Sequence, residues 1–274
     1  MKSILITGVS SGVGNALAIH LSKAGHQVYG CVRKNEDFDA LLDLKIKNLQ
    51  PVFLDVTSTE SIEEAKNNLP SSLDVLVNNA GISCGGPLEM NTLENIYDVF
   101  EVNVIGLMLL TKAIIPLLEN TKGRIINIGS TANYMSLPGI SVYSASKYAV
   151  RSFTDAMRRE LAPLGIDVVL AALGAVESEL WNKAVIAKEK QIKDNPELVD
   201  KYKKLVLYGK KISTEMKRMP TEEAAKIIEK AVTDEKPKHV YLVGKDVKLV
   251  KKLSKLPSKL LDKIIIKRIN EGKL

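Results

Sequence analysis

Three side chains in the middle of the sequence have the chemistry and the spacing to transfer a proton. Tyr143 and Lys147 stand four residues apart in the segment YSASK, and Ser130 lies thirteen residues before Tyr143. If YSASK is helical, the phenol and the ammonium group share one face. We then expect the cation to lower the pKa of the tyrosine from about 10, so that the phenol can exchange a proton with a substrate oxygen. By itself, YxxxK equally describes an exposed tyrosine beside a solvated lysine.

A glycine-rich turn near the N-terminus has the form of a phosphate cradle. It follows the apolar run KSILIT and precedes a segment of helical periodicity that ends at Gly25. Glycines let the backbone approach a phosphate, and the free N–H groups of a helix N-terminus bind the anion. The residues of this cradle are Gly8, Ser10, Ser11, Gly12, Val13 and Gly14. The spacing is GxxxGxG and not GxGxxG, so a tight turn without a ligand stays an alternative.

Five motifs occur together in one order and at one set of spacings. They are TGVSSGVG (7–14), NNAG (78–81), Asn103, Ser130 and YSASK (143–147). Over about residues 1–245 they resemble the short-chain dehydrogenase/reductase family, and the details are similar to the branch of 17β-hydroxysteroid and retinol dehydrogenases. The resemblance implies hydride transfer between a nicotinamide cofactor and a carbonyl or alcohol.

The resemblance also implies catalytic roles for Asn103, Ser130, Tyr143 and Lys147. Ser130 would donate a hydrogen bond that strengthens as charge develops on the substrate oxygen, and Tyr143 would deliver the proton. Lys147 would also bind the nicotinamide ribose, while Asn103 would hold a water connected to Lys147. The cofactor would supply the hydride, and the protein the orientation and electrostatics. Taken alone, Ser130 also fits a turn at a strand end, and Asn103 a polar residue at a helix interface.

The end of the second expected strand bears on the choice of cofactor. Enzymes of this architecture that use NAD commonly place an acid there, whereas an arginine accommodates the 2′-phosphate of NADP. Here Val32 occupies the position of the acid, and Arg33 and Lys34 follow it. A guanidinium binds phosphate in a bidentate manner, so we expect NADP(H). Glu36 or Asp37 would serve NAD(H) if the loop folds back.

Further cofactor contacts follow from the resemblance. They are Asp55 and Val56 after the third strand, Asn79, Ala80 and Gly81 after the fourth, and Gly174, Val176 and Ser178 after the sixth. Asp55 would accept a hydrogen bond from the adenine amino group, or else serve as a turn or capping residue. Asn79 is as well suited to tying strands together. The family segment PGxVxT reads LGAVES here, and the loss of the proline frees the backbone of this loop.

The elements that would position these residues alternate between strand and helix. The apolar runs expected to be strands are 2–7, 27–33, 49–54, 74–78, 123–129, 167–172 and 239–243. This alternation predicts an α/β fold, a single-domain Rossmann-type doubly wound parallel sheet flanked by helices. We expect a catalytic domain over 1–244 with a lid insertion at about 179–219, then a basic amphipathic helical tail over 245–274.

The expected lid is the only evidence on the substrate. It is rich in lysine, yet it carries apolar residues at helical spacing. Such a segment over a cleft suits a lipophilic ketone or secondary alcohol, with Trp181 and Tyr208 joining Ser130 and Tyr143 as substrate contacts. Core packing is the alternative for the apolar residues of the lid.

Charge is concentrated at the C-terminal end. The net charge of +7 equals the balance of residues 245–274, which hold ten Lys/Arg and three Asp/Glu. The apolar residues at helical spacing in this tail are Val250, Leu253, Leu256, Leu260, Ile264 and Ile265, with Pro257 interrupting them. This amphipathic element would pack on the domain, meet a partner, or lie on an anionic membrane surface.

Other features narrow the functional class. Two cysteines, Cys31 and Cys84, form no disulfide framework, and three scattered histidines have no metal-ligand spacing, so no metal is expected. We see no signal peptide and no apolar run long enough to span a bilayer. These features predict a cytoplasmic protein with a possible peripheral membrane contact. No nucleic-acid motif accompanies the charge.

Quaternary structure and activity complete the expectations. We expect a homodimer or homotetramer built on helices over about 92–119 and 143–162. The apolar residues that suggest it are Ile105, Leu107, Leu109, Leu110, Val150, Phe153 and Met157. The leading interpretation is an NADP(H)-dependent carbonyl reductase or alcohol dehydrogenase. The alternatives are an epimerase or dehydratase, and a catalytically silent dinucleotide-binding regulator or membrane-peripheral protein.

Overall fold

Seven parallel strands form one sheet in the order β3-β2-β1-β4-β5-β6-β7. The computed structural model describes residues 1–273, without the side chains of 180–184, 187 and 188. The strands are β1 (Ser3–Thr7), β2 (Gln27–Val32), β3 (Leu49–Phe53), β4 (Val75–Asn78), β5 (Arg124–Ser130), β6 (Asp167–Leu173) and β7 (Val240–Val243). Each strand coincides with an apolar run singled out in the sequence, and the predicted Rossmann-type α/β fold is confirmed.

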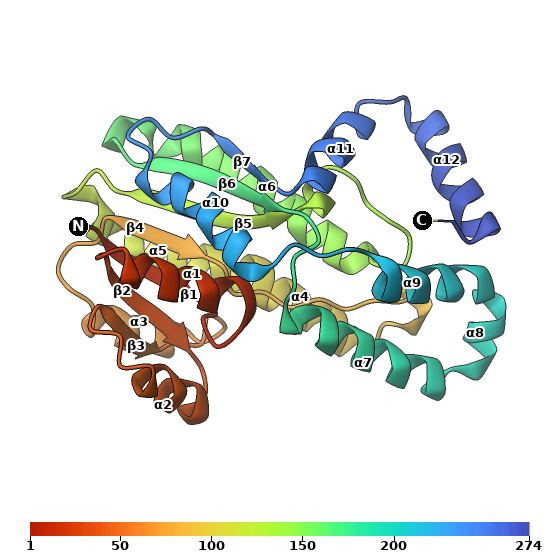
Figure 1. Cartoon of the computed structure of the whole chain (residues 1–274), viewed down its shortest axis with the longest axis horizontal. Helices are drawn as coiled ribbons and strands as arrows, with labels where there is room; N and C mark the ends of the chain where they lie inside the picture. Colours follow the sequence, from red (N-terminus) through yellow and green to blue (C-terminus); the bar gives the residue numbers. More distant parts are fainter. Residues whose placement is uncertain (274) are drawn as a thin grey trace.

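Helices cover both faces of the sheet (Figure 1). The helices that pack on one face through the largest core cluster are α1 (Gly12–Lys23), α2 (Asn35–Asp43) and α10 (Thr221–Thr233). The helices that cover the other face are α3 (Thr59–Asn67), α4 (Leu93–Phe100), α5 (Leu107–Glu119) and α6 (Ser141–Glu160). Strands buried on both sides explain the near-continuous apolar runs in the sequence.

Helices α4 and α5 form one continuous rod interrupted by a π-helical stretch, η2 (Glu101–Gly106). Such stretches are rare and occur often at functional sites, and this one contains Asn103. The rod, Leu93–Glu119, is long and apolar enough to cross a membrane by length and composition, which the sequence analysis did not expect. Leu110, Ile114 and Leu118 are at most 1 % exposed and pack in the core under the sheet, as in the core helix of a globular domain.

The sheet order reverses beside β1, because β2 lies on one side of it and β4 on the other. In such sheets ligands bind outside the carboxyl ends of the strands, at the point of reversal. The glycine-rich turn follows β1, NNAG ends β4, Ser130 ends β5, and the LGAVES segment ends β6. The topology therefore gathers four motifs that are far apart in sequence.

Two further groups of helices extend the sheet domain on one side (Figure 1). The first contains α7 (Glu179–Asp194), α8 (Pro196–Lys201) and α9 (Lys203–Glu215). The second contains α11 (Lys245–Leu253) and α12 (Ser258–Glu271). Val247 of α11 is fully buried in a cluster with α6 and β6. The short 3₁₀ turns are η1 (Leu88–Met90), η3 (Thr131–Asn133) and η4 (Ala162–Leu164).

Candidate active site

Ser130, Tyr143 and Lys147 meet at the carboxyl end of β5. Ser130 is the last residue of the strand, and α6 carries the other two on one face. The Lys147 ammonium donates to the carbonyl oxygen of Ile128 at 3.1 Å and lies 5.8 Å from the centroid of the Tyr143 ring. The arrangement brings a hydroxyl, a phenol and a cation to one place, as the spacing in the sequence predicts.

Burial sets the proton affinities of this group. Burial lowers the pKa of Lys147 from 10.5 to about 8, because a desolvated ammonium loses its hydration. Burial also raises the pKa of Tyr143, and the hydrogen bond with Ser130 opposes that rise in part. The expectation that Lys147 lowers the tyrosine pKa is therefore wrong for this structure, because desolvation of the phenolate has the larger effect. Tyr143 keeps its proton at neutral pH.

Asn103 fastens the π-helical stretch to the end of β4. Its amide oxygen accepts from the backbone N–H of Ile82 at 2.8 Å, and its amide nitrogen donates to the Ile82 carbonyl and to the Ser146 hydroxyl. A Cβ on Gly81 would lie 3.1 Å from the Asn103 oxygen and 3.7 Å from the Lys147 nitrogen. Asn103 thus lies beside Lys147 and holds the chain that passes between them.

Asn133 is a site residue that sequence reasoning missed. It is fully buried, and its side chain accepts from the backbone N–H of Ser130 at 2.5 Å and donates to the backbone carbonyl of Lys147. One amide therefore fixes the strand that carries the hydroxyl relative to the helix that carries the cation. Its position three residues after Ser130 is the one sequence feature that could have indicated a role in the site. A single sequence, however, does not reveal whether an asparagine after a strand is buried or lies in an exposed loop.

The glycine-rich turn has the shape of a cradle for a dinucleotide phosphate. Gly8 and Gly12 have φ of +68° and +60°, which glycine adopts freely. A Cβ on Gly8 would lie 2.9 Å from Ala80, and one on Gly14 would collide with the Asn79 amide. Helix α1 begins at Gly12 with no side-chain cap and no acid in its first turn. Its free N–H groups fit an anion, so the residues present fit the pyrophosphate of a nicotinamide dinucleotide.

The segment after β4 ties the cradle to the sheet. The Asn79 amide nitrogen donates to the carbonyl oxygens of Thr7 at 2.9 Å and Gly8 at 3.0 Å. The backbone N–H groups of Asn79 and Ala80 both donate to the Thr7 hydroxyl. The strand-tying alternative for Asn79 is thus what the structure shows, and Ala80 and Gly81 follow it directly.

The second strand ends next to the cradle, where the ribose of a dinucleotide would lie. The backbone N–H of Val9 donates to the carbonyl of Cys31 at 3.1 Å. Arg33 follows β2 with 57 % of its side chain exposed, and its guanidinium lies 3.7 Å from the Asp55 carboxylate. The other Asp55 oxygen accepts from the N–H and hydroxyl of Thr57, which is the turn role considered for it. Val56 is buried beneath the rod and would contact a Cβ on Gly106.

The loop after β6 is held by a residue that the sequence analysis did not single out. The Asp246 carboxylate of α11 accepts from the backbone N–H of Ala175 at 2.7 Å, and a Cβ on Gly174 would collide with that carboxylate. Val176 forms a bridge with Met219. Asp246 therefore restrains a loop that lacks the family proline at Leu173. The contact joins residues 71 positions apart, so no local pattern announces it.

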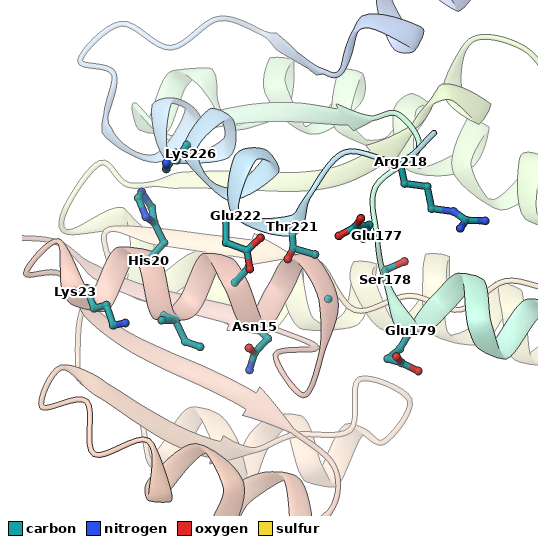
Figure 2. A pocket seen from close by; sticks show the side chains of 13 residues that line it. Asn15, His20, Lys23, Glu177, Ser178, Glu179, Arg218, Thr221, Glu222 and Lys226 are labelled. Atoms are coloured by element: carbon teal, nitrogen blue, oxygen red, sulfur yellow. The ribbon is translucent and has the colours of Figure 1, made fainter. Parts of the chain in front are cut away.

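A groove with a volume of about 690 Å³ lies between α1 and α10 (Figure 2). Gly12 and Ser178 form part of its lining, and a Cβ on Gly12 would lie 3.2 Å from that of Ser178. Neither Ser130 nor Tyr143 lines it. The groove borders the phosphate cradle from the outside, and the reacting groups lie elsewhere.

Helices α7 to α9 approach the reacting groups from the other side. Leu205 of α9 lies within 3.7 Å of where a Cβ of Gly139 would be, in the segment before α6. Glu89 of η1 accepts from Lys201 at 2.6 Å and from Tyr202 at 2.5 Å, so this group of helices is fastened to the segment after β4. Tyr208 is buried in α9. The side chain of Trp181 lies outside the described residues.

Comparisons with known proteins agree with this architecture. The family model of the short chain dehydrogenases matches residues 2–189. The NADPH-dependent 3-dehydrocapnine reductase of Ornithobacterium rhinotracheale is 32% identical over 284 residues, covering 99% of this chain and 98% of that protein. Retinol dehydrogenase 16 of Rattus norvegicus is 35% identical over 197 residues, covering 70% and 62%, so the predicted likeness to retinol dehydrogenases is confirmed.

A solved structure extends the similarity to the whole fold. A short-chain dehydrogenase from Streptomyces avermitilis superimposes with a TM-score of 0.77 at 28% identity, covering 98% of this chain and 95% of that chain. The seven-stranded parallel sheet agrees with this similarity. The chain belongs to the short-chain dehydrogenase/reductase family, and it is an NAD(P)-dependent oxidoreductase that acts on a carbonyl or an alcohol.

Proposed function

We propose that this protein uses NADPH to reduce a lipophilic ketone to a secondary alcohol, with Tyr143 as the general acid. The observation that carries the proposal is the convergence of Ser130, Tyr143 and Lys147 at the end of β5. The four motif residues expected to be catalytic, with Asn103 as the fourth, all lie within this one region.

The chain's own groups would act on the substrate oxygen. Ser130 and Tyr143 donate hydrogen bonds to the ketone oxygen, which orients the carbonyl and stabilises the charge that develops there. When bound, NADPH supplies the hydride that forms the new C–H bond. The proton of the Tyr143 hydroxyl completes the alcohol, and the phenolate left behind is stabilised by the Lys147 cation nearby.

The proton affinities suit reduction. Burial raises the pKa of Tyr143, so the residue holds a proton ready for donation at neutral pH. With a pKa of about 8, Lys147 is mainly charged at pH 7 and available to the phenolate. Above that pH the cation is lost, and the rate of reduction should fall with it.

Arg33 supports the choice of NADPH. Its guanidinium is more than half exposed beside the end of β2, where a 2′-phosphate would lie. Among the described residues, this side chain forms an ion pair with Asp55 at 3.7 Å, and an exposed pair of this kind contributes at most about 1 kcal/mol. A phosphate could therefore recruit the guanidinium. The relative from Ornithobacterium rhinotracheale is itself named as NADPH-dependent.

Apolar residues of α9 support a lipophilic substrate. The side chains of Val206 and Tyr208 in α9 are buried, and Leu205 of the same helix lies beside the segment before α6. Apolar walls of this kind enclose ligands with few polar groups. Tyr208 and Trp181 remain our proposed substrate contacts. We also propose that residues 179–219 form the lid of a catalytic domain over 1–244.

The experiment is a panel of aliphatic and aromatic ketones assayed with NADPH and with NADH. We expect turnover of lipophilic ketones, with NADPH preferred. Binding of NADPH without turnover of any ketone or alcohol would instead support the silent dinucleotide-binding regulator.

We also propose a homodimer or homotetramer that works in the cytoplasm. Three of the seven apolar residues expected at the subunit interface are core residues instead: Leu107, Leu110 and Val150 are at most 6 % exposed. Exposed apolar side chains nevertheless gather on the same helices: Leu93, Tyr97, Ile105 and Tyr148. Light scattering on the purified protein should find a multiple of the 30.1 kDa chain; a monomer at all micromolar concentrations would refute the oligomer.

A further inference from the structure

The last helix, α12, stands apart from the sheet domain and contacts α9 (Figure 1). None of its residues is buried. Lys204 of α9 donates to the Asn270 amide at 3.2 Å, and Lys211 donates to the Gly272 carbonyl at 2.9 Å. The two helices therefore form one surface, which we call the α9–α12 face and define as residues 203–215 and 258–273.

Large apolar side chains are exposed on the α9–α12 face. Leu207 is 57 % exposed, Leu260 47 % and Ile266 56 %. On α12 the remaining apolar residues are half-buried: Leu261, Ile264, Ile265 and Ile269. Helix α9 therefore covers α12 only in part, and large apolar side chains stay exposed on the face.

The same face is strongly basic. Helix α9 contains four lysines and one glutamate, and residues 258–273 contain five basic and two acidic residues. Most of these cations form no ion pair with an acid in the part of the chain that the structure describes. Among the described residues, the ion pairs on the face are those of Lys211 with Glu215, and of Lys267 and Lys273 with Glu271. Residues 1–244 contain twenty-nine residues of each sign, so the excess charge is local.

We propose that the α9–α12 face binds the surface of an anionic lipid bilayer. Lysines and arginines around exposed leucine and isoleucine match both parts of such a surface, the charged headgroups and the apolar boundary beneath them. A protein partner would need a groove that is both acidic and apolar. The face shows no feature that would select such a groove over a lipid surface. Because α9 also belongs to the proposed lid, docking here would place the lid next to the lipid.

This inference goes beyond the proposed reaction and does not depend on it, because its readout is binding. The full chain should co-sediment with vesicles of phosphatidylcholine containing phosphatidylglycerol, and not with phosphatidylcholine alone. Binding should decrease at about 1 M salt, where the screening length falls to about 3 Å.

Full-length charge variants give the decisive comparison. Truncation at Gly244 is unsuitable because it removes the buried Val247 and the Asp246 contact with the loop after β6. The test variant replaces Lys259, Lys263 and Lys267, which lie along one side of α12 and are exposed, with glutamine. Three lost cations should weaken binding to anionic vesicles by about 100-fold.

A matched control removes the same charge from the opposite end of the molecule. It replaces three exposed lysines with glutamine: Lys47, Lys230 and Lys236. The end of α10 and the loop after α2 lie far from α12 (Figure 1). This control should bind as the wild type does. A second variant, Leu260→Ser with Ile266→Ser, should reduce the part of the binding that survives high salt.

Several results would overturn the proposal. These are equal binding by wild type and the α12 lysine variant, equal loss in both lysine variants, equal binding to neutral vesicles, or no binding by the wild type. A change of oligomeric state in the α12 variants, without vesicle binding, would show that a second copy of the chain covers the face.

Discussion

The buried Lys147 should destabilise the fold that holds it. Lys147 is 6 % exposed, and burial lowers its pKa from 10.5 to about 8. This shift of about 2.5 units, at about 1.4 kcal/mol for each unit, corresponds to a cost of about 3 kcal/mol. Because the folded-state pKa is the lower one, the full cost applies below pH 8 and disappears as the pH rises toward 10.5.

Replacement of Lys147 by methionine isolates this cost. Methionine is unbranched and apolar and fills the same space without a charge. It also leaves the Ile128 carbonyl without its partner, a loss of about 1–3 kcal/mol that does not depend on pH. The informative quantity is therefore the change with pH of the difference between the two proteins.

The assay is denaturant unfolding of both proteins at about pH 7 and about pH 9.5. The unfolding free energy of the wild type should rise by about 2 kcal/mol relative to the variant between these values. The range stops short of pH 10. Above that pH the unfolded state loses the Tyr143 proton while the folded state, in which the pKa is raised, keeps it, so the unfolding free energy falls as the pH rises. Lys112→Met, at an exposed position of α5, should show no such change. A difference between wild type and Lys147→Met that stays constant with pH would refute the reasoning.

Two further substitutions test the cofactor site. Arg33→Ala should weaken NADPH binding by about 10- to 100-fold and leave NADH binding nearly unchanged, because a hydrogen bond to a charged group contributes about 1.5–3 kcal/mol. Titrations of both cofactors measure this, with Lys34→Ala as the control. An unchanged cofactor preference would place the 2′-phosphate contact elsewhere. Asp246→Ala should lower kcat/KM by about tenfold, because it releases the Ala175 N–H. Asp246→Asn keeps an acceptor oxygen and should retain most of the wild-type kcat/KM. An equal loss of kcat/KM in both variants would contradict a positioning role for Asp246.

Much of the fold could be predicted because its signals are local. Buried parallel strands are apolar throughout, and glycines punctuate the turns between strands and helices, so all seven strands were located from the sequence. The order of the strands and the position of the motifs at one edge of the sheet were not predicted and come from the structure. The Tyr143 and Lys147 pair followed from helical spacing.

The remaining features depend on contacts between distant residues. Asp246 reaches the loop after β6 from the beginning of the tail, and Asn133 joins Ser130 to the α6 backbone. Neither contact leaves a periodic pattern in the sequence. The pKa of Tyr143 was misjudged for a related reason, because spacing reveals the neighbouring cation but not the degree of burial.

The central claim is that the Tyr143 hydroxyl delivers the proton to the substrate. Tyr143→Phe removes that hydroxyl and leaves Lys147, Ser130 and the glycine cradle in place. Steady-state reduction of the best ketone, together with a titration of NADPH, measures it most directly. The account predicts a fall in kcat of about 10²- to 10⁴-fold with NADPH affinity nearly unchanged. Turnover within about tenfold of the wild type would contradict the account.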